Sequence, residues 1–323
     1  MKTTVITLVA GRHAHLRLQL RGLARSERAP DDHVVVSMGD PGVAPLIESE
    51  GYSAHTEWLP TAGGPLPPPA SGPLPPPARG PLPPPARGPL PLSAARNLGA
   101  ERALARGADL LVFLDVDCIP SAGLLGLYER AASNPRHRDA LLCGPVTYLP
   151  PPGPGGYDLT RLGRNVHPHP ARPDPPAGTI HVGDEYDLFW SLSFATTRET
   201  WTAVGGFCTD YIGYGGEDTD FAQRAARAGV GLRWIGGAHA FHQHHPVSDP
   251  PVEHMHEILY NAAVFHRHWG RWPMTGWLAR FAEAGLARYD AATDRWVATR
   301  ARRDLTRPGR CLGTDVRGNS VET

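Results

Sequence analysis

A buried strand that ends in two carboxylates is the feature that most constrains this chain. Residues 110–114 read LLVFL, an apolar run of strand length, and Asp115-Val116-Asp117 follows at once. Carboxylates beside such a strand are costly to bury unless something pairs their charge. A divalent cation would pair it, and ligands of open parallel sheets bind at the carboxyl ends of the strands. The run therefore predicts a metal site that serves a phosphorylated ligand.

Strand and helix patterns alternate along the chain around this run. We expect strands at 3–9, 33–38, 54–58, 109–114, 140–148 and 232–235, and helices at 15–23, 43–50, 93–106, 122–132 and 217–228. Such alternation is typical of an α/β fold with a mostly parallel sheet flanked by helices. We expect this domain to span residues 1–248. A C-terminal helical segment at 249–300 would pack on it, and a flexible tail at 301–323 would follow.

Composition narrows the class of protein. The chain has 323 residues, is 41% hydrophobic, and carries 32 basic and 32 acidic residues, so it lacks the basic surplus of a nucleic-acid binder. Its cysteines are scattered without a CxxC pair, which favours a reduced intracellular chain. They are Cys118, Cys143, Cys208 and Cys311. We see no signal peptide and no transmembrane run. We expect a cytoplasmic protein, with peripheral contact at the inner membrane face left open.

A proline-rich repeat interrupts the domain. Residues 64–87 are three copies of an eight-residue unit, GPLPPPA followed by Ser or Arg, and a partial fourth copy follows. This much proline excludes helix and central strand, so we expect a disordered insertion at 63–91 made of polyproline II segments. It could dock a proline-binding partner. A tandem expansion tolerated in a surface loop is the simpler interpretation, because long loops cost little closure entropy.

A second acidic block follows a glycine-rich turn. Residues 213–220 read GYGGEDTD, and the glycines let the backbone approach a ligand closely. Glu217 and Asp218 open the helix expected at 217–228. Acids in a first turn are a common way to start a helix, and that is the alternative. The same helix end also favours an ionised carboxylate that can take a proton from an attacking hydroxyl.

Histidine and arginine supply two further candidates. Residues 240–245 read AFHQHH after an expected strand, and a mixed carboxylate and imidazole shell can hold Mn²⁺. A solvated polar turn is the alternative. Arg96 and Asn97, on the helix that precedes the acidic strand, could touch a nucleotide or sugar, although an ordinary helix explains them as well. We interpret four other histidines of the C-terminal segment as surface or packing residues: His254, His256, His266 and His268.

Together and in this order, these pieces resemble the GT-A glycosyltransferases, specifically family 2 with a galactosyltransferase-type C-terminal module. Residues 12–16, RHAHL, look like the Arg…His-Leu of β-1,4-galactosyltransferases, and residues 95–99, ARNLG, match an Ala-Arg-Asn-x-Gly segment of the family. Residues 204–207 and 213–220 look like the family's NGF…GWGGEDDD block. Residues 240–243, AFHQ, are similar to the Ala-Tyr-His-Gln of chondroitin-polymerase-type enzymes. The resemblance covers roughly residues 3–245.

The resemblance implies a role for each matched residue. It implies that Asp218 is the catalytic base, with Glu217 holding a hydroxyl beside it, and that Mn²⁺ or Mg²⁺ binds Asp117, His242 and His244, with His245 the alternative histidine. Tyr214 and Trp190 would face the acceptor. The nucleotide-sugar contacts would be Arg12, Asp40, Arg96, Asn97, Asp115, Val116, Asp117, Gly215 and Gly216.

The implied reaction is inverting transfer of a hexosyl group to an acceptor hydroxyl. The donor would be a nucleoside-diphosphate sugar, with UDP-galactose, N-acetylgalactosamine, glucose or N-acetylglucosamine types as the expected range. The acceptor would be a glycan, a lipid-linked sugar or a small molecule. A nucleotidyltransferase is the alternative enzyme, but residues 10–12 are too short for its phosphate loop. A catalytically inactive sugar-nucleotide scaffold that uses the repeat is the non-enzymatic alternative.

Overall fold

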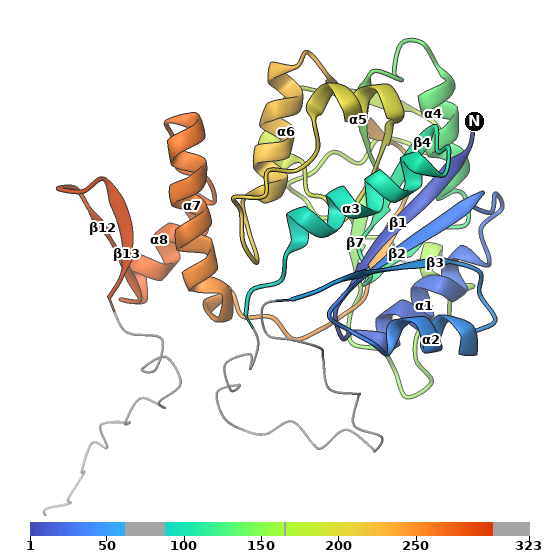
Figure 1. Cartoon of the computed structure of the whole chain (residues 1–323), viewed down its shortest axis with the longest axis horizontal. Helices are drawn as coiled ribbons and strands as arrows, with labels where there is room; N and C mark the ends of the chain where they lie inside the picture. The colour runs from blue at the N-terminus through green and yellow to red at the C-terminus, as the bar shows by residue number, and fades with distance from the viewer. Residues whose placement is uncertain (62–87, 165, 300–323) are drawn as a thin grey trace, which may run out of the picture.

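The computed structural model describes residues 1–61, 88–164 and 166–299 (Figure 1). The repeat at 64–87 and the tail at 301–323, with our expectations for both, lie outside the described residues. Residues 88–91, the last part of the expected insertion at 63–91, are among the described residues, and Leu90 lies against the domain. There the carbonyl of Leu90 accepts a hydrogen bond from the Gly213 amide at 3.1 Å, and the Leu90 side chain packs against the core.

An eight-stranded mixed sheet forms the centre of the fold, in the order β3-β2-β1-β4-β9-β6-β10-β8. Strands β8 and β9 run against their neighbours, and the other pairs are parallel, which confirms the predicted mostly parallel sheet. The strands are β1 (Thr3–Val9), β2 (Asp32–Met38), β3 (His55–Leu59), β4 (Leu110–Leu114), β6 (Ala140–Cys143), β8 (Ile180–Gly183), β9 (Ser193–Thr197) and β10 (Gly231–Ile235).

Helices cover both faces of this sheet (Figure 1). Neighbouring residues of a strand point to opposite faces, and β1 shows the consequence. Ile6 packs in the cluster beneath α3, whereas Val5 packs in the cluster beneath α4. Both faces of the strand are buried, as the continuous apolar pattern predicts. The helices of this domain are α1 (His13–Leu23), α2 (Val43–Ser49), α3 (Leu92–Ala105), α4 (Leu124–Ser133), α5 (Arg198–Val204) and α6 (Glu217–Arg227).

The strand expected at 140–148 is two strands in two different sheets. β6 ends at Cys143, and β7 (Val146–Tyr148) joins a small sheet with β5 (Cys118–Pro120) and β11 (Ala240–His242) in the order β5-β11-β7. The break falls at Gly144, where a Cβ atom would lie 1.9 Å from the Ala238 carbonyl oxygen, and at Pro145, which has no amide hydrogen to donate. Within the small sheet His242 pairs with Cys118, which brings the histidine segment beside Asp117.

The C-terminal segment begins with the expected helices and ends in a hairpin. α7 (Met255–Trp269) and α8 (Thr275–Glu283) are followed by β12 (Ala287–Asp290) and β13 (Arg295–Ala298), which the sequence analysis did not predict. The segment has its own apolar cluster and lies beside α6 in Figure 1. The Asn261 amide of α7 also hydrogen-bonds both backbone groups of Ile212, so α7 is fixed to the loop that precedes α6.

Three short 3₁₀ turns complete the described elements. They are Leu162–Arg164, Tyr186–Leu188 and Val252–His254.

None of the helices within the described ranges combines the length and hydrophobicity that a bilayer crossing requires.

Candidate active site

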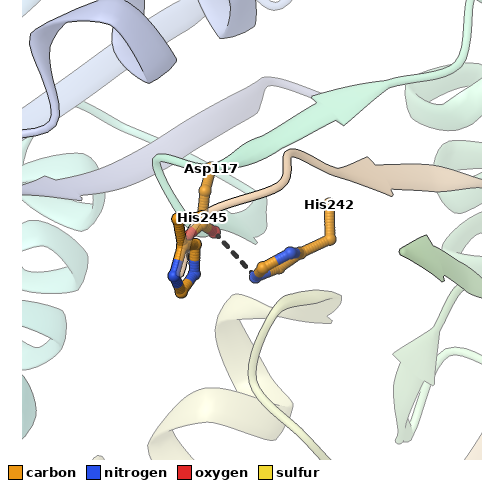
Figure 2. A group of neighbouring side chains, drawn as sticks. All are labelled: Asp117, His242 and His245. Carbon is orange, nitrogen blue, oxygen red and sulfur yellow. Dashed lines mark ion pairs between the residues drawn. The ribbon is translucent and has the colours of Figure 1, made fainter. Parts of the chain in front are cut away.

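Asp117 lies between two histidines at the carboxyl end of β4. Its Oδ1 atom is 3.5 Å from Nε2 of His242, and its Oδ2 atom is 3.5 Å from Nε2 of His245. Figure 2 shows the His242 ring pointing at the carboxylate. One ligand atom from each of the three residues lies within 4.8 Å of the others. A carboxylate and two imidazoles form a donor set that fits Mn²⁺ and leaves coordination positions for substrate oxygens.

His245 takes the place that we predicted for His244. The His244 side chain is exposed, and its backbone amide donates to the Tyr157 hydroxyl at 3.1 Å. The cause is the end of β11 at His242, after which side chains no longer alternate. Gln243 is buried, with its amide nitrogen on the His15 carbonyl and its backbone N–H on the Asp117 carbonyl. The following turn directs His245 to Asp117. The sequence His242-Gln243-His244-His245 contained both candidate ligands but did not show which of them lies beside Asp117.

The charges around Asp117 suit a cation ligand. Burial opposes its ionised form, but the hydrogen bond from His245 and the charge of Arg12 act in the opposite direction, and the pKa of Asp117 is lowered. The Arg12 guanidinium lies 2.5 Å from the carboxylate. Burial is also the main cause that lowers the pKa of His242, which favours the neutral imidazole that coordinates metals.

Arg96 connects this region to the second acidic block. Its guanidinium lies 3.2 Å from Oε1 of Glu217 and 3.6 Å from Oδ1 of Asp115, and all three groups are largely shielded from solvent. The same guanidinium lies over the Phe207 ring at 5.0 Å. Because Arg96 contacts both blocks, residues of β4 and α6 that are about 100 positions apart form one continuous site.

Asp218 lies at the N-terminal end of α6 in a buried setting. Burial and then the neighbouring Glu217 charge raise the pKa of Asp218 to about 7. Backbone amides of Thr219 and Ser191 hydrogen-bond its carboxylate and act in the opposite direction. A carboxylate with a pKa near the working pH is suited to accept a proton from a hydroxyl.

The glycine turn before α6 needs its glycines. Gly215 and Gly216 have φ values of 99° and 89°, a left-handed backbone that disfavours side chains. The Gly215 amide donates to Oε2 of Glu217 at 3.1 Å. The turn therefore fixes the Glu217 carboxylate between a backbone donor and Arg96.

Three other predicted contacts have structural partners instead. Asp40 accepts hydrogen bonds from the amides of Gly11 and Gly42 and lies 2.8 Å from Nε2 of His13. Both ends of the Asn97 amide bond the backbone of Phe207 at 2.8 Å. Val116 is buried in the cluster beneath α1 and α2. These side chains contact the backbone and the packed residues around the site. Arg12 instead contacts the Asp117 carboxylate, and Arg96 contacts the Glu217 carboxylate.

Aromatic rings line the space beside the cation cluster. The Tyr148 ring lies 4.7 Å from His242 and 5.9 Å from His169, and Trp190 lies 4.8 Å from His169. Tyr214, the other predicted acceptor residue, is 41% exposed, and its ring lies 5.8 Å from Trp277. The sequence analysis found Trp190 and Tyr214 but missed Tyr148, which sits at the end of the strand that we had merged with β6.

Arg172 is a buried cation that the sequence analysis also missed. It is 5% exposed and lies between the Trp190 and Trp234 rings, with its guanidinium carbon 5.2 and 4.7 Å from the ring centroids. None of its three side-chain nitrogens has a hydrogen-bond partner among the described residues. An unpaired buried charge is costly, so Arg172 is suited to receive an anionic group. Its setting in a proline-rich loop gave no sequence signal.

One segment of the chain matches a known family model. Residues 177–246 match the family model described as the N-terminal domain of galactosyltransferase. The matched segment contains the glycine turn, Glu217, Asp218, His242 and His245. This segment of the chain is therefore similar to a glycosyltransferase domain.

Two solved structures resemble this chain at low identity. The mannosyltransferase PcManGT from Pyrobaculum calidifontis, in complex with GDP-Man and Mn²⁺, is 15% identical over 88% of this chain and 76% of its own, with a TM-score of 0.47. GalNAc-T7, with UDP, GalNAc and Mn²⁺, is 12% identical over 88% of this chain and 57% of its own, with a TM-score of 0.48. No curated protein matches the chain in sequence.

Proposed function

We propose that this chain is a glycosyltransferase, which transfers a hexosyl group from a nucleoside-diphosphate sugar to an acceptor hydroxyl with inversion, aided by Mn²⁺ or Mg²⁺. The observation that carries the proposal is the separation of two charged centres with Arg96 between them. One centre is Asp117 with His242 and His245, and the other is Glu217 with Asp218. The first suits the leaving diphosphate, and the second suits the attacking hydroxyl.

The leaving-group side consists of Asp117, His242, His245 and Arg12. The two imidazoles and the carboxylate would hold the cation, which when bound neutralises charge on the departing diphosphate. The Arg12 guanidinium, 2.5 Å from Asp117, adds positive charge at the same place. Arg12 lies immediately before α1, so the amino end of this helix lies beside the cation site.

The attacking side depends on Asp218. Its raised pKa allows it to accept the proton of the acceptor hydroxyl during attack on the anomeric carbon. Retention through a covalent intermediate would need a second, free carboxylate as nucleophile. Glu217 is held by Arg96 and the Gly215 amide, so it is not free for that role. A single displacement with inversion is the mechanism that these contacts favour.

The galactosyltransferase match supports a UDP-hexose as donor. The aromatic rings of Tyr148 and Trp190 offer flat apolar faces that suit a sugar ring. The acceptor class stays a prediction of a glycan, a lipid-linked sugar or a small molecule. The cytoplasmic location with peripheral membrane contact likewise stays a prediction.

A donor panel tests the proposal. Purified protein would be incubated with UDP-, GDP- and other nucleotide sugars, with and without Mn²⁺, and release of nucleoside diphosphate would be measured. We expect Mn²⁺-dependent release from at least one UDP-hexose, and loss of that release in the His242→Ala variant. Absence of release from every donor, with glycan, lipid-linked and small-molecule acceptors supplied, would contradict the proposed activity.

A further inference from the structure

A second group of metal-ligating side chains lies on the side of α6 that faces α7. It consists of Cys208 in the loop after α5, Asp220 on α6 and His268 in the last turn of α7. One ligand atom from each lies within 4.8 Å of the others. None of these residues belongs to the candidate active site, and we name the group the α6–α7 cluster.

The Asp220 carboxylate has one crowded oxygen and one free oxygen. Oδ1 accepts hydrogen bonds from the Tyr211 hydroxyl at 3.1 Å and from Nε1 of Trp269 at 2.9 Å, and it lies 3.4 Å from Nδ1 of His268. Oδ2 has no partner among the described residues, although Asp220 is only 1% exposed. A buried carboxylate oxygen without a donor is unfavourable, so a cation at Oδ2 would satisfy it.

His268 is oriented as metal-binding histidines commonly are. Its Nδ1 atom faces Asp220, and its Nε2 atom lies 4.0 Å from Oδ2 of Asp210. A histidine that binds a metal through one ring nitrogen usually donates its other N–H to a carboxylate. Asp210 is therefore placed on the side of the ring where such an orienting carboxylate lies.

Neighbouring arginines do not neutralise the cluster. Arg224 and Arg227 line the same cavity of about 480 Å³. The Arg224 guanidinium donates to the carbonyls of Gly206 and Val204 at 2.7 and 3.0 Å. The Arg227 guanidinium lies over the Trp269 ring at 3.8 Å. Within the described residues neither arginine forms an ion pair with Asp220, so its negative charge is left for another cation.

We propose that Cys208, Asp220 and His268 form a Zn²⁺ site, separate from the active-site cation. A thiolate, an imidazole and a carboxylate are a Zn²⁺ donor set, whereas Mg²⁺ and Mn²⁺ favour oxygen-rich sites. Zn²⁺ bonds are about 2.0–2.3 Å long, so the three ligand atoms would have to move slightly closer together. His268 can make that movement because its side chain is 34% exposed. On binding, the Cys208 thiol forms an S–Zn bond and releases its proton to solvent.

The site would connect α6, which also carries Asp218, to the loop after α5 and to α7. Asp220 lies two residues after Asp218 on α6, Cys208 precedes the glycine turn, and His268 lies in the last turn of α7. A bound ion would therefore fix the amino end of α6 against α7. We expect Zn²⁺ to stabilise the folded chain, because the three ligands come together only when it folds.

Co²⁺ spectroscopy tests the site without any assay of activity. The full chain with Cys311→Ser, which removes the thiol outside the described residues, would be stripped with a chelator and titrated with Co²⁺. We expect the near-ultraviolet absorption of a cobalt–thiolate bond at one equivalent per chain, and its displacement by Zn²⁺. The absorption should persist in His242→Ala, which removes an active-site ligand, and in Cys143→Ala, which removes a thiol distant from the cluster.

Two variants distinguish the cluster from other thiol sites. Cys208→Ala should abolish the cobalt–thiolate absorption, and His268→Ala should weaken Zn²⁺ binding by at least about tenfold. In the His242→Ala background, which removes an active-site ligand, Zn²⁺ should raise the Tm, and the further substitution Cys208→Ala should abolish that rise. Absence of the absorption from the parent chain, or its survival in folded Cys208→Ala, would overturn the proposal. Neither result would count against the proposed transfer reaction, because the α6–α7 cluster does not include Asp117 or Asp218.

Discussion

Arg96 and Glu217 form a buried ion pair at 3.2 Å, although 121 residues separate them in sequence. The pair joins α3 to α6 and places the two acidic blocks of the chain in one site. Since Arg96 also lies 3.6 Å from Asp115, one guanidinium balances carboxylates from both blocks. Both the stability of the site and its charge therefore depend on this residue.

Removal of Arg96 should destabilise the fold strongly. Arg96→Met would leave Glu217 and Asp115 buried without their cation, and breaking a buried pair from one side costs roughly 3–5 kcal/mol. Urea unfolding would measure the loss. The matched control is Arg102→Met on the same helix, whose exposed pair with Glu57 should contribute about 1 kcal/mol or less. Equal effects of the two substitutions would contradict the buried-pair interpretation.

Asp218 should make activity and stability depend on pH in opposite directions. Its pKa is raised to about 7, so kcat/KM should rise with pH through about 7 as the base ionises. The folded state holds this proton more tightly than the unfolded state does. The contribution of Asp218 to stability is therefore fully present below its ordinary pKa of 3.8, and it is lost as pH rises through about 7. We expect Asp218→Asn to be more stable than the parent protein at pH 8, as measured by urea unfolding. A variant less stable at that pH would show that the carboxylate is not destabilised by burial.

His245 and His244 should behave differently although they are adjacent. His245 lies 3.5 Å from Asp117, whereas the His244 side chain is exposed. His245→Ala should weaken Mn²⁺ binding by at least about tenfold, and His244→Ala should leave it unchanged. Calorimetric titration of Mn²⁺ in the presence of UDP would compare the two variants. The reverse order of effects would restore His244 as the ligand.

Arg172 should act on substrate binding rather than on folding. Arg172→Met keeps most of the apolar stem between Trp190 and Trp234 but removes the unpaired charge, which is often neutral or stabilising for the fold. If the guanidinium receives an anionic group of a substrate, the KM for that substrate should rise about 10–100-fold. Steady-state kinetics with varied donor and varied acceptor would identify the substrate concerned. Unchanged KM values for both would exclude the role.

The sequence predicted those features whose signals are local. β1 spans the predicted residues, because its buried, β-branched run is distinctive on its own. Asp117 and Asp218 could be proposed as site residues because Asp117 follows a regular strand and Asp218 opens a regular helix, and their roles stay predictions. The split between β6 and β7 was missed, because the apolar pattern continues across Gly144 while the break depends on the Ala238 backbone nearby.

Features that depend on distant contacts could not be predicted in this way. Asn97 resembles a ligand-binding residue in sequence, yet the Phe207 backbone 110 residues away satisfies its amide. The choice of His245 over His244 depends on where β11 ends. Arg172 gave no signal because its two tryptophan neighbours come from other parts of the chain.

The rate of sugar transfer by the Asp218→Asn variant tests most directly the central claim that Asp218 is the catalytic base. Asn keeps the size and the hydrogen-bonding shape of the side chain but cannot accept the hydroxyl proton. We predict that transfer from the best donor falls by about 10²–10⁴-fold, while donor binding measured by calorimetry with Mn²⁺ stays within about twofold. Asp187→Asn, an exposed carboxylate paired with Arg271, is the control and should transfer normally. Normal transfer by Asp218→Asn would contradict the assignment of Asp218 as the base.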